Sequence, residues 1–190
     1  MIYNEILTDV KEKFKNHPKR LKHILAVVKE AKKLAKHYNY NLDSAMIAAL
    51  FHDYTKYDCL EKQLSFLDKA EITKYEEFPF FYHGLSASRV LKQKYQINNL
   101  DILHAISCHT WGALEMNLLD KIILISDKIE KNRNYPEVKR LRKLAYQDLN
   151  LACIEFLISS IEYTKSKEHK IHEEQYQIID YLKGEKNDKN

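Results

Sequence analysis

Six histidine and aspartate residues lie on or beside stretches that are otherwise apolar: His23, His52, Asp53, His83, His109 and Asp127. The sharpest signal is the pair His52-Asp53, which closes the apolar stretch AMIAALFHD. Adjacent residues inside a helix diverge by about 100°, but at a helix C-terminus the chain can bend so that both side chains reach one point. Imidazole and carboxylate ligands suit iron, manganese, nickel, cobalt or zinc better than calcium. As a set, these residues predict a metal centre.

Each of these residues, taken singly, also has a purely structural interpretation. His52 could pack in the core while Asp53, at a helix end, is solvated. The set is more informative, because His23 lies near the apolar face of its helix, where an unpaired imidazole is costly to bury. Asp127 lies within IILISDKI, where a carboxylate needs a partner for the same reason.

Two other classes of site are not supported by the residue types. The cysteines Cys59, Cys108 and Cys153 are scattered and form no CxxC pair, so neither a disulfide framework nor a thiolate zinc site is indicated. The chain has only three glycines and no glycine-rich phosphate loop. Side chains or metals must therefore carry the charge of any bound phosphate.

The bulk properties predict one cytoplasmic domain. The chain has 190 residues, 45% of them hydrophobic and 31% charged, with a net charge of +4. Its basic residues alternate with acidic ones, which favours an anionic small molecule over nucleic acid as the partner. The longest apolar run, Ala45 to Phe51, is far shorter than the roughly 20 residues that cross a membrane, and the N-terminus has no signal-peptide pattern.

Helical periodicity dominates the chain and predicts an all-α fold. The predicted helices are Ile2–Phe14, Pro18–Tyr38, a third through Ala45–Leu50 capped by Asn41 or Asp43, Leu60–Ala70, one from Gly84 to Tyr95, Leu100–His109, Leu118–Ile129, one or two helices from Glu137 to Lys165, and His172–Lys183. We predict a single domain over residues 1–183, followed by a disordered polar tail, GEKNDKN, over residues 184–190.

The order H…HD…H…H…D resembles the signature of the HD-domain metal phosphohydrolases. More specifically, the chain resembles the YqeK family of symmetrical dinucleoside tetraphosphate hydrolases over roughly residues 18–150. The matching stretches are RLKHILAV, AALFHDYTK, FYHGLSA, AISCHTWG and LDKIILISDKIEKNR. Two positions, Thr55 and Ser126, hold residues other than the alanine that is commoner in the family.

This resemblance implies a compact HD-type helical bundle with a metal, iron in the family, near its centre. Carried over by position, His23, His52, Asp53 and Asp127 would be metal ligands, and Asp53 could bridge to a second metal held by His83 and His109. With one metal, His83 and His109 would instead face the substrate phosphates. Asp53, His83 and His109 are accordingly the predicted catalytic residues. The sequence determines neither the number of metal ions nor the oligomeric state. A homodimer is one option.

The resemblance also implies that diadenosine tetraphosphate is split symmetrically into two ADP molecules by metal-activated water. The predicted phosphate-binding residues are Arg20, Lys56, His83, Thr110 and Arg133. Without the resemblance, Arg20, Lys56 and Arg133 would be interpreted as solvated surface charges. The alternatives are another HD-domain nucleotide phosphohydrolase, such as a nucleotidase, and a non-catalytic nucleotide or metal sensor. A helical interaction module without metal is a third alternative.

The remaining aromatic and histidine candidates have simpler interpretations. Trp111 could stack on a base, but packing in the core or a loop is favoured. His104 is predicted to be a packed or surface residue. We predict that the other histidines, which lie in polar or terminal surroundings, are solvated: His17, His37, His169 and His172.

Overall fold

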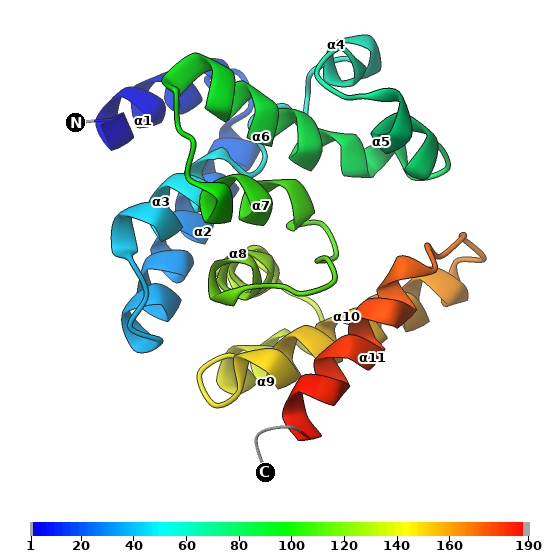
Figure 1. Cartoon of the computed structure of the whole chain (residues 1–190). Coiled ribbons are helices and arrows are strands. Elements are labelled where there is room, and N and C mark those ends of the chain that lie inside the picture. The colour runs from blue at the N-terminus through cyan, green and yellow to red at the C-terminus, as the bar shows by residue number, and fades with distance from the viewer. Residues whose placement is uncertain (1, 188–190) are drawn as a thin grey trace.

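The computed structural model describes residues 2–187, and side chains as far as Gly184 (Figure 1). Its elements are α1 (Ile2–Lys13), α2 (Pro18–His37), α3 (Leu42–Phe51), α4 (Leu60–Leu64), α5 (Lys69–Lys74), a 3₁₀ turn (Pro79–Phe81), α6 (Tyr82–Tyr95), α7 (Leu100–Cys108), α8 (Leu118–Ile129), α9 (Val138–Leu144), α10 (Leu149–Ser166) and α11 (Glu174–Asn187). No strand occurs in the described part of the chain, so the all-α prediction is confirmed. Over the same residues, no helix has both the length and the apolar character needed to cross a bilayer.

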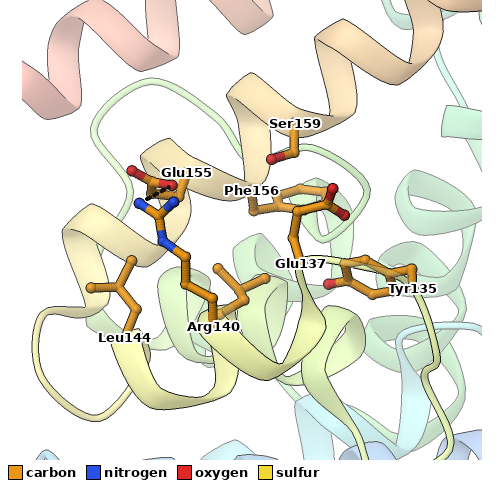
Figure 2. A pocket seen from close by; sticks show the side chains of 8 residues that line it. Tyr135, Glu137, Arg140, Leu144, Glu155, Phe156 and Ser159 are labelled. Carbon is orange, nitrogen blue, oxygen red and sulfur yellow. Dashed lines mark ion pairs between the residues drawn. The ribbon is translucent and has the colours of Figure 1, made fainter.

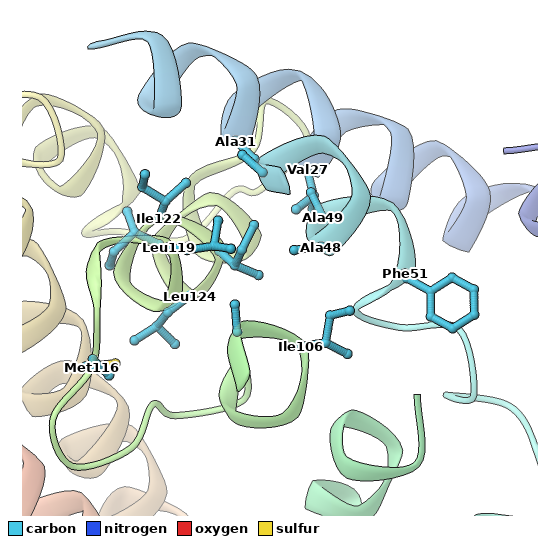
Figure 3. Packing of buried hydrophobic residues seen from close by; sticks show 14 of the residues in the cluster. Val27, Ala31, Ala48, Ala49, Phe51, Ile106, Met116, Leu119, Ile122 and Leu124 are labelled. Carbon is cyan, nitrogen blue, oxygen red and sulfur yellow. The ribbon is translucent and has the colours of Figure 1, made fainter. Parts of the chain in front are cut away.

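The helix α8 is the centre of the fold, with α2, α3 and α7 packed on one side and α9 and α10 on the other (Figure 1). Nearly every residue of α8 is buried, including the run Ile122 to Asp127. Apolar side chains from α2, α3, α7 and α8 meet in the core, among them Val27, Ala48, Ile106 and Leu124 (Figure 3). The polar side chains within this run, Ser126 and Asp127, therefore lie in the interior.

The helix α3 delivers its last residue into the core. Its N-cap is Asn41, whose side chain accepts a hydrogen bond from the Ser44 backbone N–H at 2.8 Å. Asp43 is thus not the cap. The small side chains of α3, such as Ala48 and Ala49, are completely buried and permit close packing against α2. Because α3 ends at Phe51, the following histidine and aspartate lie at a buried helix end.

The predicted helix from Leu60 to Ala70 is wrong, because α4 and α5 take its place. The Asp68 side chain accepts a hydrogen bond from the Glu71 N–H (2.8 Å), and the Glu71 carboxylate accepts one from the Asp68 N–H (3.2 Å). This capping box starts a new helix at Lys69. A continuous helix would place Asp68 in its interior, where the cap could not form.

The C-terminal part of the chain differs from the prediction in its helix bounds. Separate helices α9 and α10 occupy the stretch from Glu137 to Lys165, and the Asp148 side chain caps α10 by accepting from the Leu151 N–H at 2.8 Å. The last helix starts at Glu174 rather than His172 and runs to Asn187. Residues 184–187 are therefore helical instead of part of a disordered tail, and residues 188–190 lie outside the described residues.

Candidate metal centre

Five helices bring the six predicted ligands to one buried position. His23 lies on α2, His52 and Asp53 directly follow α3, His83 lies in the first turn of α6, His109 caps the C-terminus of α7, and Asp127 lies on α8. All six are buried, with exposed fractions from 0% for His52 to 9% for His23.

Asp53 lies at the middle of this group, and its two carboxylate oxygens face different histidines. Oδ2 is 3.3 Å from His52 Nε2 and 3.6 Å from His23 Nε2. Oδ1 is 3.1 Å from His83 Nε2 and 3.8 Å from His109 Nε2. Asp53 thus connects two sets of nitrogen atoms. Asp127 joins the first set, since its Oδ1 is 3.1 Å from His23 Nε2.

Three of the histidines use Nδ1 to contact the backbone carbonyl three residues earlier. The pairs are His52 with Ala49 (2.7 Å), His83 with Phe80 (2.5 Å) and His109 with Ile106 (2.8 Å). A neutral imidazole that donates from Nδ1 has its lone pair on Nε2. Each ring therefore directs an acceptor toward Asp53, in the tautomer that a metal ligand requires.

The Nε2 atoms are poorly satisfied by the protein alone. His23 Nε2 and His52 Nε2 are buried and make no hydrogen bond with the described residues. His83 Nε2 and His109 Nε2 are 3.0 Å apart, so two lone pairs would face each other. A cation held between these nitrogens and the Asp53 carboxylate would remove both problems. The donor set and its orphaned atoms therefore fit one or two transition-metal ions.

Glu130 is a residue of this site that the sequence interpretation missed. Its carboxylate is 2% exposed, and Oε1 lies 3.3 Å from His23 Nδ1. Its other oxygen accepts hydrogen bonds from the Asn132 backbone (2.7 Å) and side chain (2.9 Å). Glu130 thus orients His23 so that Nε2 faces Asp53. Its only signal in the sequence is its position three residues after Asp127.

Arg142 holds the segment that carries Glu130. From α9, its guanidinium donates to the carbonyls of Ile129 and Glu130 at 2.8 Å and of Arg133 at 3.0 Å. The helix α8 ends at Ile129, so no following helical turn supplies donors to the Ile129 and Glu130 carbonyls. Arg142 therefore fixes the turn from which both Glu130 and Arg133 reach the metal centre.

Four cationic side chains surround the carboxylates: Arg20, Lys56, Lys128 and Arg133. Arg20 donates to Asp53 Oδ2 at 2.5 Å, and Arg133 donates to Asp127 Oδ1 at 2.6 Å. Lys56 Nζ lies 3.3 Å from His83 Nε2. Lys128 Nζ lies 2.7 Å from Asp127 Oδ2, and the sequence interpretation missed it because adjacent helical residues usually diverge.

The buried charges alter the protonation of the site. Burial would raise the pKa of Asp53, but the neighbouring His52, His109 and His83 hold that pKa well below its usual value. Burial lowers the pKa of His83 and brings that of His109 to about 3. Burial also lowers the pKa of Lys56. His52 differs, because burial would lower its pKa but the neighbouring Asp53 carboxylate raises it. At neutral pH the site thus presents an ionised Asp53 and neutral His83 and His109, which is the protonation state that metal binding requires of these groups.

The close approach of α6 to α7 depends on Gly84. A Cβ at this position would lie 2.8 Å from the Ser107 carbonyl oxygen and 3.0 Å from the Ile106 carbonyl oxygen. It would also lie 3.2 Å from His109 Nδ1. Only glycine allows the two helices to approach closely enough for the neighbouring His83 to contact His109.

Of the two residues that follow His109, Thr110 stays a candidate contact to the substrate, whereas Trp111 packs in the core. The Thr110 hydroxyl is buried and has no hydrogen-bond partner among the described residues. Trp111 is 3% exposed and packs against Phe81, with ring centroids 4.4 Å apart. It therefore belongs to the core and offers no face to a base. His172 stacks on Trp111 at 5.4 Å, so its predicted solvation is wrong.

The other histidines lie away from the metal centre. His17, His37 and His169 are exposed, as predicted. His104 has a half-exposed side chain whose Nδ1 lies 2.8 Å from Asp120 Oδ2. It is a surface residue that joins α7 to α8, in agreement with the prediction.

Comparison with known proteins relates the whole chain to one family. The HD domain family model matches residues 20–132. The symmetrical bis(5'-nucleosyl)-tetraphosphatase of Bacillus subtilis is 32% identical over 180 residues, which cover 94% of this chain and 96% of that protein. The protein of the same name from Halalkalibacterium halodurans is 34% identical, with 80% of this chain and 83% of that protein covered.

A solved structure supports the same relationship. It is described as a predicted HD superfamily hydrolase involved in NAD metabolism from Clostridium acetobutylicum. Its sequence is 32% identical, and its structure aligns with a TM-score of 0.85 over 94% of this chain and 97% of that chain. The chain therefore belongs to the HD-domain family, in the group that contains the symmetrical bis(5'-nucleosyl)-tetraphosphatases.

Proposed function

We propose that this protein is a cytoplasmic metal-dependent hydrolase that splits diadenosine tetraphosphate symmetrically into two ADP molecules. The observation that carries the proposal is the convergence of four histidine Nε2 atoms on the buried Asp53 carboxylate, beside several cations. The relatives named for this activity match the chain over nearly its full length, which supports the same substrate.

The ligand atoms suggest how metal would be held. His23, His52, Asp53 and Asp127 would hold one ion, and Asp53 with His83 and His109 would hold a second. We propose iron, as the family resemblance implies, while the same ligands would also accept manganese, nickel, cobalt or zinc. When bound, such a metal supplies Lewis-acid stabilisation and a water of lowered pKa.

The chain's own cations would bind the phosphates. A chain of four phosphates carries about four negative charges, which need several positive groups for neutralisation. Lys56 and Lys128 lie beside opposite ends of the ligand cluster, near His83 and Asp127. Arg20 and Arg133 pair with ligand carboxylates and can also donate to phosphate oxygens, because a guanidinium has five N–H donors.

The proposed reaction adds water to one of the two central phosphorus atoms. The bond from that phosphorus to the central bridging oxygen breaks, and each half leaves as ADP. Burial keeps His83 and His109 uncharged, so they would act as metal ligands or accept a hydrogen bond from the attacking water, and Asp53 remains ionised. We propose the buried Thr110 hydroxyl, which has no hydrogen-bond partner among the described residues, as a donor to a phosphate oxygen.

Elemental analysis combined with chromatography of the products tests the proposal. The purified protein should contain about one or two transition-metal ions per chain and should convert diadenosine tetraphosphate to ADP alone. Asp53→Ala should lose both metal and turnover, whereas Asp43→Ala, an exposed carboxylate on the first turn of α3, should keep both. Turnover by a verified metal-free Asp53→Ala protein would contradict the mechanism.

Two alternatives have distinct outcomes in the same experiment. Nucleoside and inorganic phosphate as products, with a mononucleotide as the preferred substrate, would indicate a nucleotidase. Tight ADP binding with very slow turnover would indicate a nucleotide sensor. Absence of metal, with no activity after iron or manganese is supplied, would indicate an interaction module.

A further inference from the structure

A groove with aromatic walls lies between the C-terminal half of α10 and the segment that leads into α9. It encloses about 670 Å³, which is within the usual range for small-molecule sites. The residues that form its walls and ends include Tyr135, Glu137, Phe156, Ser159, Glu162 and Tyr163. Figure 2 shows a smaller neighbouring pocket beside α9, which shares Tyr135, Glu137, Phe156 and Ser159 with the groove.

Lys128 does not itself line the groove, but it connects the wall residue Phe156 to the candidate metal centre. The Lys128 ammonium lies 5.1 Å from the centroid of the Phe156 ring and 2.7 Å from Asp127 Oδ2. The Tyr135 hydroxyl donates to the Lys128 carbonyl at 3.0 Å, which ties the wall of the groove to the end of α8. A molecule whose flat part lay on Phe156 would therefore present its next group to Lys128 and then to the metal ligands.

The sign of the charged side chains changes along the path from the candidate metal centre to the groove. The metal-centre end carries Lys128 and Arg133, while the groove carries the exposed carboxylates of Glu137 and Glu162. Phosphates would be repelled by these carboxylates and attracted to the cations. Carboxylate and serine oxygens can instead accept hydrogen bonds from amino groups on a heterocyclic base. The path thus matches a molecule with a base at one end and phosphates at the other.

We infer that this groove binds one nucleoside of the substrate, with the base against Phe156 and Tyr163 and the adjoining phosphates at Lys128. The inference rests on the proposed function, and it identifies residues that select a nucleotide over a bare polyphosphate. Stacking of a base on an aromatic ring is independent of the metal and acts mainly on binding. Loss of the rings should therefore raise KM and leave kcat nearly unchanged.

The variants Phe156→Leu and Tyr163→Ala test this site. Leucine keeps apolar packing at the half-buried Phe156, and Tyr163 is 67% exposed, so neither change should unfold the protein. We expect KM for diadenosine tetraphosphate to rise roughly 5- to 100-fold, with inhibition by inorganic tripolyphosphate unchanged. Tyr176→Ala, which removes a tyrosine 39% exposed on α11, is the matched control and should keep the wild-type KM.

The possible outcomes distinguish failure of the nucleoside site from failure of the proposed reaction. If wild-type protein hydrolyses the dinucleotide but both variants keep its KM, the groove does not bind the nucleoside. Equal loss of tripolyphosphate inhibition, or a change in oligomeric state, would also contradict the site. If wild-type protein hydrolyses nothing, the proposed function fails. Calorimetry with ADP and pyrophosphate then tests whether the groove binds a nucleoside. Weaker ADP binding with unchanged pyrophosphate binding in the variants would still support it.

Discussion

His23 is held between carboxylates on both sides of its ring. Nδ1 faces Glu130, and Nε2 faces Asp53 and Asp127. A carboxylate behind a ligand histidine fixes the ring orientation and makes the opposite nitrogen a stronger donor to metal. At the scale of single residues, we therefore expect the chemistry of the proposed site to depend on Glu130, which lies behind His23.

Replacing Glu130 with glutamine should weaken metal binding about 10- to 100-fold. The amide keeps the size of the side chain but removes the charge that holds the His23 Nδ1 proton. Titration against a chelator of known affinity would measure the change. Glu173→Gln, at an exposed position, is the control. An unchanged metal affinity in Glu130→Gln would show that His23 does not need this carboxylate.

Replacing Lys56 with alanine should raise KM for diadenosine tetraphosphate by about 10-fold or more, because a charge-assisted contact to phosphate is lost. Metal content should stay at the wild-type level, since Lys56 offers no ligand atom to a metal in its charged form. Steady-state kinetics and elemental analysis would check both. Lys62→Ala removes an exposed lysine on α4 and should change neither. Loss of metal in Lys56→Ala would assign the lysine to positioning His83.

At the scale of helices, the contact between α6 and α7 decides whether His83 and His109 share one site. Gly84→Ala would push a Cβ against two carbonyl oxygens of α7 and against His109. We expect a loss of about 1–3 kcal/mol in the free energy of unfolding and weaker metal binding by His83 and His109. Gly184→Ala, where no atom lies within 4 Å, is the matched control and should be tolerated. Denaturant unfolding with metal titration would test this, and equal stability of the two variants would contradict it.

The contact between α7 and α8 should make stability depend on pH. The hydrogen bond to Asp120 raises the pKa of His104 above its ordinary value. A histidine whose pKa is higher in the folded state stabilises the protein below its unfolded pKa, about 6.5, and this stabilisation is lost as the pH rises through the folded pKa. His104→Ala should therefore lower Tm more at pH 5.5 than at pH 9. His169→Ala is the exposed control, and an equal decrease at both pH values would exclude the ion pair.

At the scale of the whole molecule, the candidate metal centre joins elements that are far apart in the chain. The proposed ligands come from α2, the end of α3, α6, α7 and α8. A ligand that binds only the folded state stabilises it by about 2.7 kcal/mol at 100 times its Kd. For a chain of this length that corresponds to roughly 5–10 °C in Tm.

Removal of metal with a chelator should therefore lower Tm by several degrees, and readdition should restore it. Differential scanning calorimetry would measure both steps. Asp53→Ala should show no dependence on added metal, because the carboxylate between the two sets of histidines is missing. If metal-free and metal-loaded wild-type protein unfolded at the same temperature, the ion would not bridge these helices.

The sequence by itself determined the residue types of the site and the helices that carry them. The apolar run through α3 and the pair His52-Asp53 at its end predict a buried, chemically active helix terminus. The amphipathic pattern of α8 likewise predicts a buried Asp127. These features depend on contacts within a few residues of one another, such as the Asn41 cap, and local contacts can be inferred from spacing.

Only the tertiary structure decided which of these groups meet and how. Glu130 contacts His23 across 107 residues of sequence, and His83 contacts His109 only because Gly84 lets α6 approach α7. Packing also removed Trp111 from the candidate base contacts and placed Phe156 beside Lys128. Such distances result from close packing of side chains from separate segments. These long-range contacts leave no pattern in the sequence, whereas helix periodicity and helix caps depend on neighbouring residues and can be inferred from it.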